Sequence, residues 1–221
     1  PVILMASFNA DSVIKALPHA TVFMGVPTYY TRLLSSGISP KDCANMRLFT
    51  SGSAPLLSQT FTDWEQATGT TILERYGMTE TGMNTSNPLE GQRKKGTVGP
   101  PLPGVECRAV DASGMDVAPG ETGDLWVRGE NVFHGYWQNA EKTAESFTDQ
   151  DPVHGFFKTG DLASIDPEGY VTIVGRNKDL IISGGLNVYP KEIELLIDQL
   201  DGVLESAVIG LPHPDFGESV C

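Results

Sequence analysis

The first third of the sequence alternates short apolar runs with amphipathic segments, and this alternation limits the fold more than any other feature. Residues 20–26, 46–50 and 70–73 are apolar runs of strand length, which is typical of buried strands. Residues 28–34 and 56–68 lie between these runs and follow a helical period. In the longer segment four apolar residues share one helical face: Leu57, Phe61, Trp64 and Ala67. This order predicts an α/β fold with a parallel sheet and right-handed crossovers.

Two turn-rich stretches follow strands of the predicted sheet. Residues 51–55 (SGSAP) come after the second strand, and residues 76–85 (YGMTETGMNT) lie just beyond the third. Open parallel sheets bind their ligands at the carboxyl ends of the strands. We therefore predict a binding site at these two stretches.

The later β-like runs are short and are separated by Gly, Pro and Asp. Residues 105–111, 123–129 and 169–175 show this pattern, which predicts a small antiparallel β region. We expect one large domain over residues 1–175. It is divided into two parts: a sheet subdomain, residues 1–100, and the β region, residues 101–175.

The pattern of apolar and polar residues changes again at Arg176. Residues 178–183 and 203–209 have the composition of strands, and residues 191–200 that of a helix, with Pro190 at its first position. We expect residues 176–221 to be the start of a small α+β domain.

The net charge of −13 limits the class of ligand. A surface this acidic lacks the basic footprint that nucleic acids and anionic membranes require. An anionic small molecule must therefore be bound by a few local cations, backbone N–H groups or a metal ion. We predict that the basic triplet at residues 93–95 is a solvated loop.

The cysteines indicate the redox compartment of the protein, and the two ends of the sequence bear on whether it is a fragment. Cys43, Cys107 and Cys221 have no zinc or disulfide spacing, which favours a reducing compartment. No apolar run is long enough to span a bilayer. The sequence starts inside an apolar run and stops where a strand is due, so we expect a fragment of a longer chain. A cytoplasmic location is expected, with an organelle left open; oligomeric state is unknown.

The motif Tyr76-Gly-Met-Thr-Glu80 has the chemistry of a nucleotide site. A glycine beside an aromatic ring lets the backbone approach a flat ligand that the ring covers. The oxygens of Thr79 and Glu80 are hard ligands of the kind that Mg²⁺ takes together with phosphate oxygens. The alternative is a capped loop after a strand.

Two later motifs also carry polar groups that could bind a ligand. In Lys158-Thr-Gly-Asp161, the carboxylate of Asp161 can accept hydrogen bonds from a ribose diol, although an Asp in a turn before a strand is the alternative. In residues 175–194, Arg176 and Lys178 precede a glycine pair that leaves room for a thin ligand.

The order of these motifs resembles that of the adenylate-forming superfamily, which includes acyl-CoA synthetases, luciferase-like enzymes and peptide-synthetase adenylation domains. The resemblance covers nearly the whole chain and rests on five motifs: SGSAP at 51–55, YGMTET at 76–81, GDLWVRG at 123–129, KTGD at 158–161 and the block at 175–194. In that family a carboxylate attacks the α-phosphate of Mg-ATP, and a thiol, usually that of coenzyme A, then takes the acyl group. The resemblance implies that residues 1–175 are the C-terminal half of the family's large N-terminal domain.

The resemblance also implies roles for individual residues. An ATP or AMP site is implied for Gly52, Ser53, Ala54, Tyr76, Gly77, Met78, Thr79, Asp161 and Arg176. Thr79 and Glu80 would be catalytic, Glu80 as the Mg²⁺ ligand. Lys178 falls at the family's interdomain hinge. Three residues would line the path to coenzyme A: Ser183, Gly184 and Gly185. The family's phosphate loop and catalytic lysine are expected before Pro1 and beyond Cys221.

Arg75 departs from the small residue that many family members carry before the tyrosine. A guanidinium is costly beside a fatty tail because a buried charge needs a partner. A second carboxylate on the substrate would supply that partner in bidentate fashion. With Arg32, which lies where the family places acyl-pocket residues, Arg75 resembles the malonyl-CoA synthetase branch. The alternatives are a surface cation for Arg32 and, for Arg75, a salt bridge with Glu74 or Glu80.

We therefore predict an ATP-dependent acid–thiol ligase that uses ATP, Mg²⁺ and coenzyme A with a small dicarboxylic acid, most simply malonate or methylmalonate. Three rivals remain open. They are a ligase for a medium-chain or aromatic acid, an adenylation domain that serves a carrier protein, and a non-catalytic nucleotide-binding module.

Overall fold

The computed structural model describes every residue except 1, 150, 153, 201, 204 and 205. The chain forms two compact units, Pro1–Leu102 and Pro103–Cys221, and each is described by itself. The expected boundary at residues 175/176 is a different division, and it stays a prediction.

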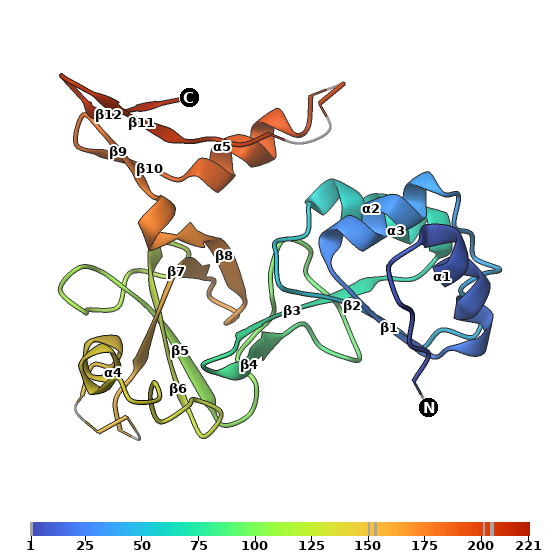
Figure 1. Ribbon diagram of the computed structural model, residues 1–221, viewed down its shortest axis with the longest axis horizontal. Coiled ribbons are helices and arrows are strands. Elements are labelled where there is room, and N and C mark those ends of the chain that lie inside the picture. The colour runs from blue at the N-terminus through green and yellow to red at the C-terminus, as the bar shows by residue number, and fades with distance from the viewer. Residues whose placement is uncertain (1, 150, 153, 201, 204–205) are drawn as a thin grey trace. The chain divides into compact units, whose positions relative to one another are not determined.

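The first unit is a four-stranded sheet of order β1-β2-β3-β4 with helices on one side (Figure 1). Its strands are β1 (Val22–Gly25), β2 (Leu48–Ser51), β3 (Ile72–Met78) and β4 (Gly82–Ser86). Its helices are α1 (Ala10–Ala16), the 3-10 turn η1 (Leu17–His19), α2 (Pro27–Ser35) and α3 (Ser58–Thr68). The strands β1, β2 and β3 are parallel, as the sequence predicts.

The helices cover the sheet through a core centred on Trp64. Its indole ring is fully buried and makes edge contacts with Tyr30 and Phe49, each at 4.9 Å between ring centroids. The helix α3 ends at Gly69, whose φ of 69° is left-handed and favours glycine. The three rings come from α2, α3 and β2, so the helical face seen in the sequence is the face that packs on the sheet.

The expected loop at residues 76–85 is instead a β-hairpin. Strand β3 continues through Met78, and β4 pairs with it antiparallel, with a register shift between Tyr76 and Gly77. A Cβ on Gly77 would meet the carbonyl oxygen of Gly82 at 2.1 Å. Glycine is therefore required for the two strands to approach this closely.

Arg93 corrects the expectation of a solvated basic loop. Its guanidinium donates from Nη1 to the carbonyl oxygen of Thr71 at 2.6 Å, from Nη2 to that of Leu89 at 3.1 Å, and from Nε to that of Pro88 at 3.3 Å. Burial lowers the pKa of Arg93. The residue therefore fastens the loop after β4 to the start of β3.

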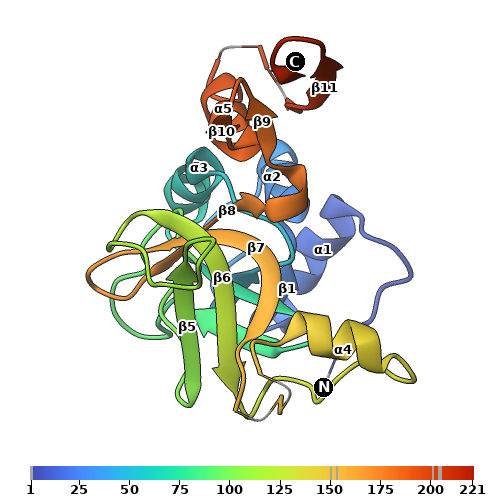
Figure 2. The ribbon, with the colours of Figure 1, turned by 90° about the vertical axis from the view of Figure 1, so that its left-hand side faces the viewer.

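The second unit begins with an antiparallel meander, whose strands lie side by side in Figure 2. Its elements are β5 (Val105–Val110), β6 (Thr122–Gly129), α4 (Ala140–Ser146), β7 (Phe157–Ile165) and β8 (Val171–Arg176). The sequence predicts β5, β6 and β8 but neither β7 nor α4. Because Asp161 lies inside β7, the alternative of an Asp in a turn before a strand is wrong.

A second small sheet of order β10-β9-β12-β11 forms the end of the chain. Its elements are η2 (Asn177–Asp179), β9 (Ile181–Ser183), β10 (Leu186–Val188), α5 (Pro190–Ile197), β11 (Gly210–His213) and β12 (Gly217–Val220). Pro190 opens α5, as expected. The strand expected at 178–183 starts later, after the turn η2. The described residues of 203–209 are irregular, Leu204 and Glu205 lying outside the described part, and the strand begins at Gly210.

Parallel and antiparallel sheets followed by a small α+β element confirm the predicted fold class. Among the described residues, no helix is long and apolar enough to cross a membrane. The three cysteines are free.

Candidate functional site

The turn after β2 carries three of the expected nucleotide-site residues in an unusual backbone conformation. Gly52 is half-buried, and Ser53 and Ala54 are exposed. Ser53 has a φ of 69°, a left-handed value that is rare for a side chain other than Gly, Asn or Asp. Such outliers persist only where the surrounding structure holds them, and they concentrate at functional sites.

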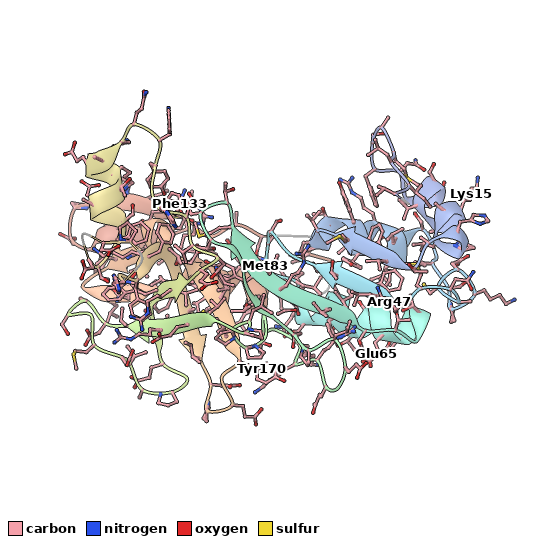
Figure 3. The ribbon with its side chains drawn as sticks, turned by 90° about the horizontal axis from the view of Figure 1, so that it is seen from below. Lys15, Arg47, Glu65, Met83, Phe133 and Tyr170 are labelled. Carbon is pink, nitrogen blue, oxygen red and sulfur yellow. The ribbon has the colours of Figure 1, made fainter. Side chains whose placement is uncertain are left out.

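Arg75 lies on β3 beside this turn. A Cβ on Gly52 would be 3.3 Å from the carbonyl oxygen of Arg75 and 3.7 Å from its Cγ, so the backbone of Arg75 passes close to the turn and its stem lies at ordinary contact distance. Its Nη1 lies 3.7 Å from the sulfur of Met83. Met83 belongs to β4 and is labelled in Figure 3. Nε is buried and has no hydrogen-bond partner among the residues that the structure describes.

No carboxylate of the described chain forms an ion pair with Arg75. Neighbouring residues of a strand point to opposite faces, so Glu74 is directed away from the guanidinium. Among the described residues, therefore, Arg75 forms no salt bridge with Glu74 or Glu80. The charge of Arg75 acts on Tyr30, where it partly offsets the rise in pKa that burial causes.

Arg32 is exposed in the last turn of α2. It lies two residues after Tyr30, which faces the core, and residues two apart point in nearly opposite directions on a helix. Tyr30 is the α2 residue whose pKa the charge of Arg75 lowers. Because Arg32 points in nearly the opposite direction, the described contacts do not bring Arg32 and Arg75 together. The surface interpretation of Arg32 agrees better with this geometry.

The hairpin β3–β4 presents the remaining motif residues of the first unit. Tyr76, Gly77 and Met78 end β3, and the phenol oxygen of Tyr76 lies 3.9 Å from the sulfur of Met78. Thr79 is exposed and Glu80 half-buried in the turn between the strands. The described part of the chain has no cluster of three metal-binding side chains. A single carboxylate at an accessible turn fits Mg²⁺ that arrives with a triphosphate, since such ions keep water and phosphate ligands.

Glu74, which the sequence leaves without a role, is a buried carboxyl in this region. Its exposed fraction is 5%. Burial raises its pKa to about 7, and the nearby backbone N–H groups of Gly96 and Leu56 oppose this rise only in part. A charged residue directly after a run predicted to be a buried strand, residues 70–73, is the signal that would have singled it out.

In the second unit, Asp161 and Arg176 are register partners on β7 and β8. Nε of Arg176 lies 3.2 Å from Oδ1 of Asp161, whose side chain is 7% exposed, while that of the arginine is 58% exposed. The backbone N–H of Asp161 donates to Oγ1 of Thr159. The pair thus places one fixed carboxylate and one accessible cation side by side.

The expected hinge and coenzyme A residues follow these strands. Lys178 is exposed in the turn η2, which is tied to β6 because Nδ2 of Asn177 donates to Oδ1 of Asp124 at 2.8 Å. Ser183 ends β9, and Gly184 and Gly185 make the turn to β10. Both glycines have positive φ, and the N–H of Gly184 donates to the carbonyl oxygen of Phe216 at 2.8 Å.

The sequence pattern of the AMP-binding enzymes matches residues 2–137, more than half of the chain. The chain belongs to the AMP-binding enzyme family. This membership confirms the resemblance to adenylate-forming enzymes that the motifs indicate.

Three members of the AMP-binding family illustrate the range of similarity. The crystal structure of ATP-bound MatB from Rhodopseudomonas palustris is 55% identical, with a TM-score of 0.94, over 98% of this chain and 43% of that one. A malonate–CoA ligase of Arabidopsis thaliana is 42% identical over 90% of this chain and 33% of its own length. A long-chain-fatty-acid–CoA ligase of Yersinia pestis is 40% identical over 90% of this chain and 35% of its own length. The chain therefore spans about a third of the length of these curated relatives.

Proposed function

We propose that this chain is part of an ATP-dependent acid–thiol ligase of the acyl-CoA synthetase type, with malonate or methylmalonate as the acid. Family membership supports the class of reaction, since its named relatives include CoA ligases. A relative that acts on malonate and one that acts on long-chain fatty acids are almost equally similar to the chain. The choice of acid therefore has to come from the site.

The observation that carries the choice of acid is the environment of Arg75. Its guanidinium is half-buried on β3, lies against the sulfur of Met83 and forms no ion pair with the described carboxylates. A cation in such a place is costly unless a ligand supplies the opposite charge. The distal carboxylate of a short diacid can accept hydrogen bonds from the guanidinium in bidentate fashion, whereas a fatty chain cannot.

The resemblance to the adenylate-forming enzymes assigns nucleotide-binding roles to residues within each unit. In the first unit, Tyr76 would cover the adenine and Gly52 to Ala54 would border it, with Gly77 and Met78 close by. Thr79 would donate a hydrogen bond to phosphate, and Glu80 would bind Mg²⁺. When bound, Mg²⁺ offsets the negative charge of the triphosphate. In the second unit, Asp161 would accept hydrogen bonds from the ribose hydroxyls, with Arg176 beside it.

Two half-reactions follow from this assignment. The proximal carboxylate of the acid attacks the α-phosphate of ATP, an acyl-adenylate forms and pyrophosphate leaves. The thiol of coenzyme A then attacks the acyl carbon, a thioester forms and AMP leaves. Lys178 would serve as the hinge between the two poses, and Ser183 to Gly185 would line the thiol path. We also propose that residues 1–175 belong to the large domain and residues 176–221 to the small one.

The test compares variants of the full-length protein in a coupled assay with malonate, ATP and coenzyme A. We expect Arg75→Ala to raise the malonate KM by about a hundredfold, with less than about a threefold change in the ATP KM. Arg47→Ala, which removes an exposed cation of the same unit, is the charge-matched control. Arg32→Ala tests the second expected cation.

The alternative is a ligase for a fatty or aromatic acid, which the Yersinia pestis relative supports. A panel of mono- and dicarboxylic acids separates the two. Turnover of decanoate or benzoate that exceeds turnover of malonate, or an equal rise of both KM values in Arg75→Ala, would contradict the proposed acid.

A further inference from the structure

The turn η2 joins the two sheets of the second unit. Strand β8 before it belongs to the sheet β5-β6-β7-β8, and β9 after it belongs to the sheet β10-β9-β12-β11. The turn is closed by the backbone N–H of Leu180, which donates to the carbonyl oxygen of Asn177 at 3.2 Å. Because the chain passes from one sheet to the other here, a rotation about this connection has to be taken up by the backbone of these few residues.

Two side chains hold the entrance to this turn. Arg176 pairs with Asp161, its register partner on β7. The next residue, Asn177, donates from Nδ2 to Oδ1 of Asp124 at 2.8 Å. Asp124 is the register partner of Leu162 on β7, and neighbouring residues of a strand point to opposite faces. The two aspartates therefore lie on opposite faces of the meander, and consecutive residues are fastened from both sides where the chain leaves it.

The strength of the bond between Asn177 and Asp124 suits a contact that breaks and forms again. Asp124 is half-buried on β6, whereas Asn177 is exposed. Burial raises the pKa of Asp124, and the hydrogen bond from Asn177 opposes this rise. A bond to a carboxylate is stronger than one between neutral groups. A single bond with one exposed partner nevertheless costs little to open, since water replaces it.

Lys178 follows this pair directly and is not held in the same way. Its side chain is exposed, and no hydrogen bond or ion pair joins it to another described residue. The part of the chain that side chains fasten to the meander thus ends at Asn177, one residue before the expected hinge.

We propose that Asp124 and Asn177 form a latch that holds the hinge turn η2 against β6 in one of the two poses of the catalytic cycle. This inference rests on the proposed function, because that function makes Lys178 the hinge. Asp124 and Asn177 are positioning residues, since they act through the backbone of η2. A bond made in one pose and broken in the other biases the populations of the two poses.

The first test measures cleavage by trypsin after Lys178 in the full-length protein, by mass spectrometry. Cleavage of a folded chain requires local opening, and its rate follows the population of the open form. We expect Asn177→Ala and Asp124→Ala each to speed this cleavage about fivefold. Asn177→Asp should speed it more, because two carboxylates repel each other. Asn45→Ala is the matched control, since it removes an exposed amide that donates to the carbonyl oxygen of Pro18 at 2.7 Å in the first unit, and it should leave the rate unchanged.

The second test separates a latch from a general loss of stability. ATP–pyrophosphate exchange in the presence of malonate measures the first half-reaction. Transfer to coenzyme A from the acyl-adenylate formed on the enzyme, in a single turnover, measures the second. Because the latch favours one pose, Asn177→Ala should change the ratio of the two rates about fivefold. A general loss of stability lowers both rates together and leaves their ratio unchanged.

Cleavage after Lys178 at the wild-type rate in both alanine variants overturns the inference, and so does an unchanged ratio of the two half-reaction rates. Failure of the unaltered protein to exchange pyrophosphate with any acid of the panel overturns the proposed function instead. The cleavage rates then still decide whether Asp124 and Asn177 hold the turn, because they do not depend on the substrate.

Discussion

The stem of Arg75 lies against the backbone of Gly52: a Cβ on this glycine would be 3.7 Å from Cγ of Arg75 and 3.3 Å from its carbonyl oxygen. The second distance is tighter than most real contacts of a side chain with a carbonyl group, so β3 or the turn would have to shift. The glycine that borders the expected nucleotide site thus also lets the backbone of Arg75, the cation that we assign to the acid, pass close to the turn.

The first prediction concerns this contact. Gly52→Ala should raise the malonate KM about three- to tenfold by displacing the arginine, since small misplacements of a binding group are costly. Gly175→Ala is the matched control, because a Cβ there meets nothing within 4 Å and the φ is not positive. The measurement is the malonate KM at saturating ATP. An unchanged value in Gly52→Ala would show that the arginine does not bind the acid in this pose.

The second prediction concerns the pH dependence of stability. Burial raises the pKa of Glu74 from 4.5 to about 7, so between these values the folded protein holds a proton that the unfolded chain has released. Stability therefore falls as the pH rises through this window, by on the order of 3 kcal/mol for this group, and is constant above it.

Glu74→Gln should remove this component, because an amide does not titrate. Urea midpoints at pH 5 and pH 8 measure the slope, and Glu65→Gln, at an exposed position of α3, is the control. Equal slopes for wild type and Glu74→Gln would mean that the buried carboxyl does not take up a proton in this range.

The third prediction concerns the pair Asp161–Arg176. If the carboxylate of Asp161 accepts hydrogen bonds from the ribose hydroxyls, Asp161→Ala should raise the ATP KM about tenfold. The same variant should bind dideoxy-ATP, which lacks both ribose hydroxyls, nearly as well as wild type does. Asp116→Ala removes an exposed carboxylate that pairs with Arg108 in the same unit and should change neither value. Equal losses with both nucleotides would assign Asp161 to structure and not to ribose.

Local patterns predicted the parallel part of the first unit. The apolar face of α3, its glycine stop and the short runs at β1, β2 and β3 follow from side-chain periodicity and backbone preference, which act over a few residues. Pro190 at the start of α5 is of the same kind. These features are readable without the rest of the chain.

The strands β4 and β7 were not predicted, because partner strands determine them. Gly82–Ser86 has little β-propensity of its own, and it becomes a strand by pairing with the edge of β3. The strand β7 contains Lys158, Thr159 and Gly160, which read as a turn, yet it pairs with β6 and β8 over most of its length. Such pairing is a property of neighbours far along the chain.

The sequence by itself determined the family and the positions of the motif residues, because motif spacing is a property of the chain alone. Only the tertiary structure decided what surrounds each charge. It made Glu74 a buried carboxyl between two loops and Arg93 a clamp on backbone carbonyls, and it left Arg32 exposed. The physical reason is that the energy of a charge depends on desolvation and on partners brought together by folding, and neither is encoded in the identity of adjacent residues.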